Sequence, residues 1–152
     1  MAMSDIDIIK ELRDQTGLSL GQISKALKEA GGDRAKALEL LAAQAGAAAA
    51  KKGDRVVKDG LVAAYVHTNG KIGALVTLAC ETDFVARNDE FKNLARDVAM
   101  HVSAMRPTTV QETLEQPFVK DPSLTVQQVI NQAIQKLGEN IQLANITWQV
   151  IG

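Results

Sequence analysis

The sequence contains one cysteine, three prolines and only 3% aromatic residues in a chain of 152 positions. One cysteine cannot form an internal disulfide, so the composition gives no support to a secreted protein held together by disulfides. No apolar run approaches the roughly 20 residues that cross a membrane, and no charged-then-apolar leader is recognisable. We therefore expect a cytoplasmic protein that makes no membrane contact.

An excess of positive charge is also missing. Lysine and arginine number 17 against 18 aspartates and glutamates, which gives a formal net charge of -1. A nucleic-acid-binding protein should carry a clear basic excess, so neither DNA nor RNA is expected as a partner. The sequence has no glycine-rich phosphate loop and should not bind GTP itself. It also has no paired histidines and cysteines at metal-ligand spacing, so no metal or cofactor is expected.

The first 45 residues have the pattern of three short helices. Ser4, a capping box from Ser19 to Gln22, and Asp33 are expected to start them, because each offers a side-chain oxygen to free backbone N–H groups. Gly17 is expected to end the first helix in a left-handed conformation. Three helices of this length form a minimal bundle of the ubiquitin-associated type, with a thin core that is marginal alone.

The composition changes at residues 46–59. Four consecutive alanines at 47–50 favour a helix, whereas glycines at 46 and 53 limit it. We expect a semi-flexible linker here. It divides the chain into a helical module at residues 1–45 and a larger domain at residues 60–152.

The larger domain is expected to contain a three-stranded antiparallel sheet. Apolar runs from Leu61 to His67 and from Ile72 to Leu78 flank Asn69-Gly70, a strong signal for a two-residue hairpin turn. Residues 141–151 alternate between apolar and polar side chains and predict a last strand.

Two amphipathic helices are expected to cover this sheet. The first starts at Asn88 or Asp89 and stops before Pro107, and the second runs from a capping box at Thr125 to Gly138. The intervening residues 108–123 are expected to be irregular. The predicted fold class is therefore α+β, with a three-helix module, a linker, and a small antiparallel sheet packed with helices.

Asp83 and Phe84 lie at the junction between the hairpin and the first of these helices. A large aromatic residue at such a corner has two interpretations. It can fill the local core under the turn, which residue type alone favours. It can also project outward as an anchor that enters a partner's pocket.

The segment from Thr82 to Asn88, with the sequence TDFVARN, resembles the core motif of the elongation factor Ts family. Three further segments match blocks of this family in the same order, at residues 12–17, 116–121 and 137–141. The resemblance covers nearly the whole chain. It favours the outward interpretation of Phe84 over the core interpretation.

The resemblance implies a guanine-nucleotide exchange factor for the translation GTPase elongation factor Tu. In the family, the helical module grips the nucleotide-binding domain of Tu, and Arg13 and Leu20 align with positions at that contact. The Asp83-Phe84 corner is then expected to wedge near the magnesium site of Tu, so that GDP leaves. No bond is made or broken in this process, so the chain is not expected to be an enzyme.

The neighbours of the corner complete the candidate contacts with Tu. Thr82 and Val85 flank Asp83-Phe84 within the motif. His101 borders the apolar stripe of the following helix, where it is either a partly buried histidine or a further partner contact. For Leu20, packing within its loop and docking onto the partner are both open.

The chain also departs from the longer members of the family. Those members carry a second copy of the core subdomain and a helical hairpin insertion, whereas this chain has one copy. A short branch of the family pairs two single-copy chains, so a homodimer through the core domain is expected. The last strand is a candidate for pairing across the two-fold axis, because exposed strand edges tend to pair.

Two other functions are compatible with parts of the sequence. An adaptor would bind Tu or another partner through the three-helix module alone and would lack exchange activity. A thiol enzyme would use Cys80 with His67 or His101 as the base. The enzyme is disfavoured, because Cys80 ends an apolar strand, and a thiol buried in apolar surroundings is inert.

Overall fold

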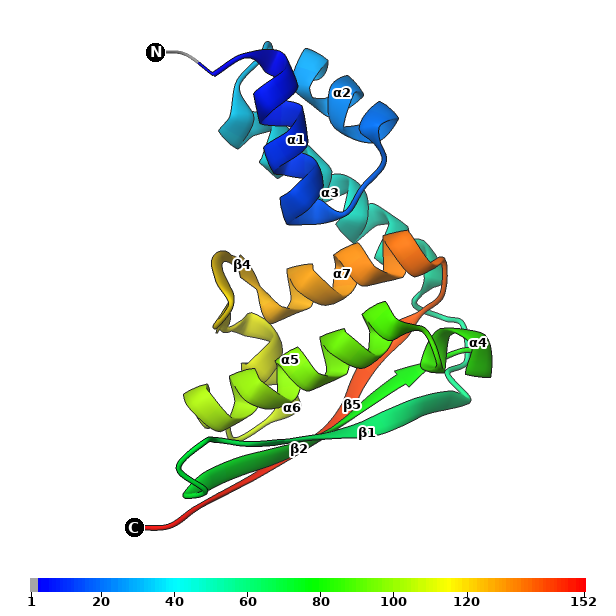
Figure 1. The fold of residues 1–152 in the computed structure, drawn as a ribbon. Coiled ribbons are helices and arrows are strands. Elements are labelled where there is room, and N and C mark those ends of the chain that lie inside the picture. Colours follow the sequence, from blue (N-terminus) through cyan, green and yellow to red (C-terminus); the bar gives the residue numbers. More distant parts are fainter. Residues whose placement is uncertain (1–2) are drawn as a thin grey trace.

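The computed structural model describes residues 3–152 and has helices at one end and a sheet at the other (Figure 1). In chain order the elements are α1 (Asp5–Thr16), α2 (Leu20–Glu29), α3 (Arg34–Lys52), β1 (Asp59–Val66), β2 (Ile72–Cys80), α4 (Asp83–Ala86), α5 (Asp89–Met105), α6 (Val110–Glu115), β3 (Pro117–Phe118), β4 (Asp121–Thr125), α7 (Val126–Leu137) and β5 (Ile141–Val150). The predicted α+β class is confirmed. Over residues 3–152, no helix is both long and apolar enough to span a bilayer.

The three N-terminal helices start where the sequence predicts, and the first of them also ends there. The Ser4 hydroxyl accepts a hydrogen bond from the Asp7 backbone N–H, and Ser19 and Gln22 form the predicted capping box. Gly17 ends α1 with a φ of 67°, in the left-handed region. The three helices enclose a small core of their own, formed by Leu12, Leu18, Ile23, Ala26, Leu27, Ala37 and Leu41.

The third helix is much longer than expected. Residues 46–52, predicted as part of a semi-flexible linker, continue α3 without a break to Lys52, so that only residues 53–58 connect it to β1. The reason is packing on both sides. Ala37 and Leu41 belong to the core of the N-terminal helices, whereas Ala49 packs against the core of the sheet domain. The C-terminal half of α3 lies along α7 (Figure 1).

The sheet has the order β1-β2-β5 with both neighbouring pairs antiparallel. The hairpin between β1 and β2 spans residues 67–71, so it is longer than the predicted two-residue turn, although Gly70 does adopt a positive φ of 70°. β5 pairs with β2 through an irregularity between Thr77 and Leu78, which leaves an extra residue on β5.

One face of the sheet is covered by α5 and α7. On α5 the predicted apolar stripe is buried at Phe91, Leu94, Val98 and Val102. The capping box at Thr125 and the left-handed stop at Gly138 bound α7 as predicted. The segment expected to be irregular instead contains α6 and the short β3–β4 pair, even though β4 includes Pro122.

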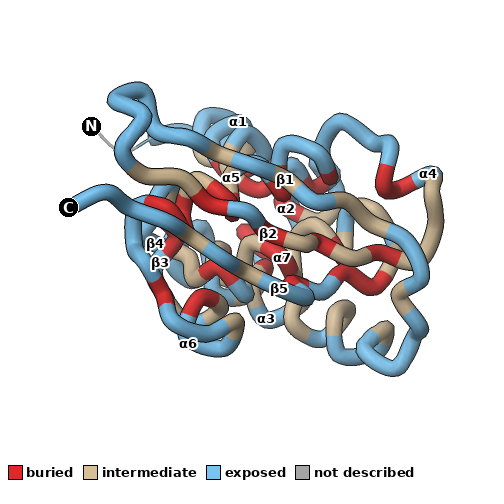
Figure 2. The backbone as a smooth tube through the Cα atoms, turned by 90° about the horizontal axis from the view of Figure 1, so that it is seen from below, coloured by how far each residue is buried: buried red, intermediate tan, exposed pale blue. Residues whose placement is uncertain are grey.

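The opposite face of the sheet is open to solvent (Figure 2). On β2 the side chains of Ala74, Val76 and Leu78 are buried, whereas Leu75 between them is 47% exposed. Val62 and Val66 on β1 are also exposed. This outer face therefore carries apolar residues that the described part of the chain does not cover.

Candidate functional site

The corner between β2 and α4 presents a large aromatic side chain to solvent. Phe84 is 83% exposed, whereas the next two residues, Val85 and Ala86, are buried in the core of the sheet domain. The interpretation of Phe84 as a core residue is therefore wrong. Val85, expected among the partner contacts, is the residue that attaches this turn to the core.

The charged side chains beside Phe84, Asp83 and Arg87, are accessible to solvent. Asp83 forms an ion pair with Arg87 one turn later, with 3.1 Å between Oδ2 and the guanidinium nitrogen. Both side chains are solvent-accessible, so the pair contributes less than about 1 kcal/mol to stability. Asn88 then caps α5 by accepting a hydrogen bond from the Glu90 backbone N–H, which ends the corner two residues after α4.

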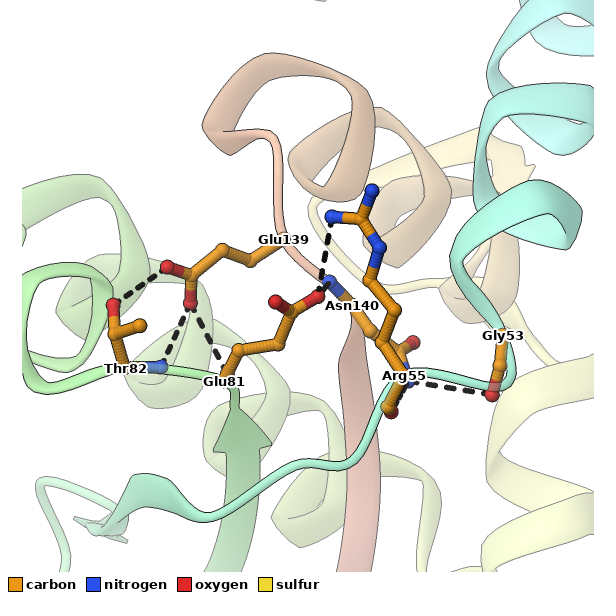
Figure 3. A network of polar contacts seen from close by, with 6 residues as sticks. All are labelled: Gly53, Arg55, Glu81, Thr82, Glu139 and Asn140. Carbon is orange, nitrogen blue, oxygen red and sulfur yellow. Dashed lines mark hydrogen bonds and ion pairs between the residues drawn. The ribbon is translucent and has the colours of Figure 1, made fainter.

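The base of the corner is held by the carboxylate of Glu139, from the turn between α7 and β5 (Figure 3). Its Oε1 accepts hydrogen bonds from the backbone N–H groups of Glu81 and Thr82, at 3.1 and 2.9 Å. Its Oε2 accepts from the Thr82 hydroxyl. Thr82 occupies the N-cap position of α4, where its hydroxyl makes no capping hydrogen bond but donates to Glu139.

A second group of contacts joins the same turn to the chain that leaves α3 (Figure 3). The Glu81 carboxylate accepts a hydrogen bond of 2.8 Å from the Asn140 backbone N–H. The Asn140 side chain is buried and donates to the carbonyl oxygens of Gly53 and Arg55, at 3.4 and 2.8 Å. Three segments far apart in the sequence therefore meet at the foot of the corner.

The other expected contact residues lie on the N-terminal helices. Arg13 on α1 and Leu20 at the start of α2 are both exposed, Leu20 by 51%. Leu18, by contrast, is buried in the core of the N-terminal helices. The helices that carry Arg13 and Leu20 lie on the other side of α7 from α4 (Figure 1).

His101 does not lie on either surface. Its side chain is fully buried, so the expectation that it contacts a partner does not agree with its position. The ring nitrogen Nδ1 accepts a hydrogen bond from the Val119 backbone N–H at 3.1 Å, which leaves Nε2 to donate to Oε1 of Gln116 at 2.9 Å. Burial lowers the pKa of His101, against a smaller opposing effect of the bond to Gln116.

Cys80 is also buried and lies directly before the corner. Burial, with smaller contributions from the charges of Glu139 and Asp59, raises the pKa of the thiol to about 11. The Sγ donates to the Thr82 carbonyl oxygen at 3.2 Å. The prediction that this cysteine behaves as a small apolar residue is confirmed.

Comparison with known proteins identifies the family to which this chain belongs. The family model described as "Elongation factor TS" matches residues 10–112 and residues 81–149. This chain belongs to the elongation factor Ts family. Residues 81–112, which carry the Phe84 corner and α5, fall within both matched stretches.

Individual elongation factor Ts proteins are similar over most of the chain. The protein named elongation factor Ts from Desulforamulus reducens is 37% identical to this chain. The alignment spans 188 positions, gaps included, and covers 94% of this chain and 87% of the relative. The one from Fervidobacterium nodosum is 38% identical, covering 95% of this chain and 96% of the relative. The one from Clostridium kluyveri is 43% identical over 93% of this chain, but over only 46% of its own length.

The residues that hold the corner were not recognised as functional from the sequence. The block at 137–141 resembles a block of the elongation factor Ts family, but the sequence alone gives no role to Glu139 or Asn140. The available signal was an acidic residue and an amide directly after the helix-ending Gly138, just before the last strand. Only the fold shows that this turn lies beside Thr82.

Proposed function

We propose that this chain is a guanine-nucleotide exchange factor that binds the GDP-bound form of elongation factor Tu and promotes GDP release. The observation that carries the proposal is the 83% exposure of Phe84 on a corner that is attached to the core on both sides. An exposed aromatic side chain on a fixed base resembles the anchors that enter partner pockets at protein interfaces. Thr82 and Asp83 directly precede this anchor and are proposed to contact the partner with it.

The proposed mechanism is differential binding and forms no covalent bond. The factor binds nucleotide-free Tu more tightly than the GDP complex, and linkage then requires that it weaken GDP binding by the same ratio. Inserting Phe84 near the magnesium site of Tu would provide this difference. The chain therefore needs no reactive group of its own, in agreement with the inert, buried thiol of Cys80.

In this proposal, one surface binds Tu and a second surface displaces GDP. Residues 1–45 form a gripping module similar to the ubiquitin-associated domain, with the exposed Arg13 and Leu20 at the contact. Residues 60–152 form the core domain that carries the wedge. Both act in the cytoplasm, without nucleic acid or a membrane as partner.

We also propose that two copies associate through the core domain. β5 is one edge strand, and the outer face of the sheet carries the exposed Leu75 on the neighbouring β2 and the exposed Val62 and Val66 on β1, at the other edge. Pairing through this region would remove apolar side chains and an unpaired strand edge from water. A solution mass of twice 16.3 kDa supports the pairing, and a monomer mass at micromolar concentration contradicts it.

The test of the function is release of a fluorescent GDP analogue from the cognate elongation factor Tu. The expected result is faster release as the factor is titrated in, with saturation at high concentration. Unchanged release despite measurable binding would instead identify an adaptor that grips Tu without exchange. A truncated chain lacking residues 60–152 gives a second comparison. An adaptor should keep the full affinity for its partner through the helical module, whereas the truncated exchange factor should bind Tu more weakly than the full chain.

A further inference from the structure

The turn between α7 and β5 contains a carboxylate that is devoted to the corner beneath Phe84. We propose that Glu139 is a positioning residue for nucleotide exchange, one that fixes the Asp83-Phe84 corner without touching the partner. This inference rests on the proposed exchange function. It adds a residue that acts within the factor, by holding the corner, and not at the interface with Tu.

The first support is the number and direction of the hydrogen bonds. Glu139 accepts two backbone N–H groups and one hydroxyl, all from the two residues that precede Asp83. Hydrogen bonds to an ionised carboxylate are roughly twice as strong as neutral ones. The link between β2 and α4 is thus held by a charged group from another part of the chain.

The second support is reciprocity. Cys80 and Ile141 are register partners at the ends of β2 and β5, so residues 81–82 and 139–140 leave the sheet side by side. The Glu139 carboxylate binds the backbone of residues 81–82, and the Glu81 carboxylate binds the backbone of Asn140 in return. Each segment therefore fixes the other at the point where strand pairing stops.

The third support is that Glu139 itself stands on a fixed base. Its neighbour Asn140 is buried and bonded to the chain after α3, at the Gly53 and Arg55 carbonyl oxygens. Gly138, on the other side, ends α7 in the left-handed conformation. The carboxylate is thus attached to elements that are themselves anchored.

Rigidity at this point matters for an inserted aromatic side chain. If the corner were loose, part of the energy gained by inserting Phe84 would be spent on ordering residues 81–84. A functional side chain performs best when its supporting contacts fix it before binding. Glu139 supplies such contacts, since Phe84 itself is exposed and receives little support from its surroundings.

The experiment compares three variants of the full chain. Glu139→Ala removes all three hydrogen bonds, whereas Glu139→Gln keeps a carbonyl oxygen that can accept from the two backbone N–H groups. Glu112→Ala is the matched control, because the Glu112 carboxylate also accepts from a threonine N–H and hydroxyl, those of Thr108 at the start of α6. Two readouts are needed: GDP release from Tu as a function of factor concentration, and amide hydrogen exchange of residues 81–91 in the free factor.

The expected result is a split between the two parameters of the release curve. Glu139→Ala should lower the maximal release rate by about tenfold with little change in the half-saturating concentration, because the gripping surface at Arg13 and Leu20 is intact. It should also speed amide exchange at Glu81 and Thr82. Glu139→Gln should recover most of the rate, and Glu112→Ala should match the wild type.

Other results would overturn the proposal in distinct ways. If wild type accelerates release and Glu139→Ala does so equally, the positioning role is wrong and the exchange function stands. If wild type does not accelerate release, the exchange function is wrong; amide exchange then decides whether Glu139 orders the corner, and unchanged protection in Glu139→Ala rejects that role. Should Glu139→Ala fail to fold, Glu139→Asp shortens the side chain by one methylene and draws the carboxylate away from Glu81 and Thr82. An unchanged maximal rate with unchanged amide protection in that variant rejects the proposal.

Discussion

Phe84 and Phe91 allow a direct test of the difference between a binding aromatic and a core aromatic. They lie seven positions apart, on α4 and α5, yet Phe84 is 83% exposed and Phe91 is fully buried. Truncation of each to alanine removes the same atoms. Phe84→Ala should therefore lose exchange activity and keep its stability, whereas Phe91→Ala should lose stability.

The magnitudes follow from the two environments. Phe84→Ala should change the free energy of unfolding by less than about 0.5 kcal/mol, as for surface substitutions generally. Phe91→Ala should cost about 3–5 kcal/mol, because it removes a buried ring and leaves a cavity in the core. In a complex, full burial of the exposed part of Phe84, on a side chain of roughly 200 Å², would be worth at most about 4 kcal/mol.

The assay combines unfolding with exchange. Urea denaturation can be followed through the chain's one tryptophan, Trp148, whose indole N–H donates to the Pro107 carbonyl oxygen at 2.8 Å and so joins β5 to the end of α5. Phe84→Ala should retain the wild-type midpoint but slow Tu-bound GDP release at least about tenfold, well within that upper limit. Normal exchange by a stable Phe84→Ala would refute the reasoning. So would a loss of stability in Phe84→Ala comparable to that of Phe91→Ala.

Three further predictions concern groups inside the fold. His101 has a lowered pKa when folded, so the unfolded chain binds more protons as pH falls below about 6.5. Stability should be complete above that pH and decline below it, with a smaller decline in His101→Gln, measured by urea unfolding between pH 5 and 8. Cys80, with its pKa of about 11, should react with a thiol reagent at pH 8 only in step with global unfolding; rapid labelling of the native protein would contradict its burial. Gly60→Ala places a Cβ 2.3 Å from the Leu78 carbonyl oxygen at a φ of 150°, so it should cost about 3 kcal/mol or more by thermal denaturation, whereas Gly21→Ala, with open space around it, should be neutral or stabilising.

The sequence predicted best those features that depend on neighbouring residues. The capping box at Ser19 and Gln22 and the left-handed stop at Gly138 each operate within four positions, so the chain shows them directly. The alternation of β5 likewise placed Ile146 and Trp148 together on the side that packs against the core.

Features that depend on distant partners could not be predicted in the same way. The alanine-rich segment is helical to Lys52 because successive turns of α3 pack against two different cores. The residues that form these cores lie elsewhere in the sequence, so the local composition does not reveal them. His101 is interior because its two nitrogens find partners 15 and 18 positions later. Its place beside an apolar stripe favoured a partly buried histidine but did not exclude a partner contact.

The candidate site shows the same division. Residue type favoured a buried Phe84, and only the resemblance of the surrounding motif indicated an exposed one. Glu139 lies 57 positions from Thr82, and the contact depends on the pairing of β2 with β5. Sequence alone thus located the corner and missed what supports it.

The length of α3 changes how the two proposed contact surfaces act together. With a flexible 14-residue tether, the second contact would form at an effective concentration set by random motion of the chain, and its ordering would weaken binding. A continuous 19-residue helix, about 28 Å long, holds the two surfaces at a fixed separation, so the second contact does not depend on random motion of a tether. The gripping helices and the Phe84 corner then reach a partner as one bivalent ligand, whose relative placement was fixed during folding.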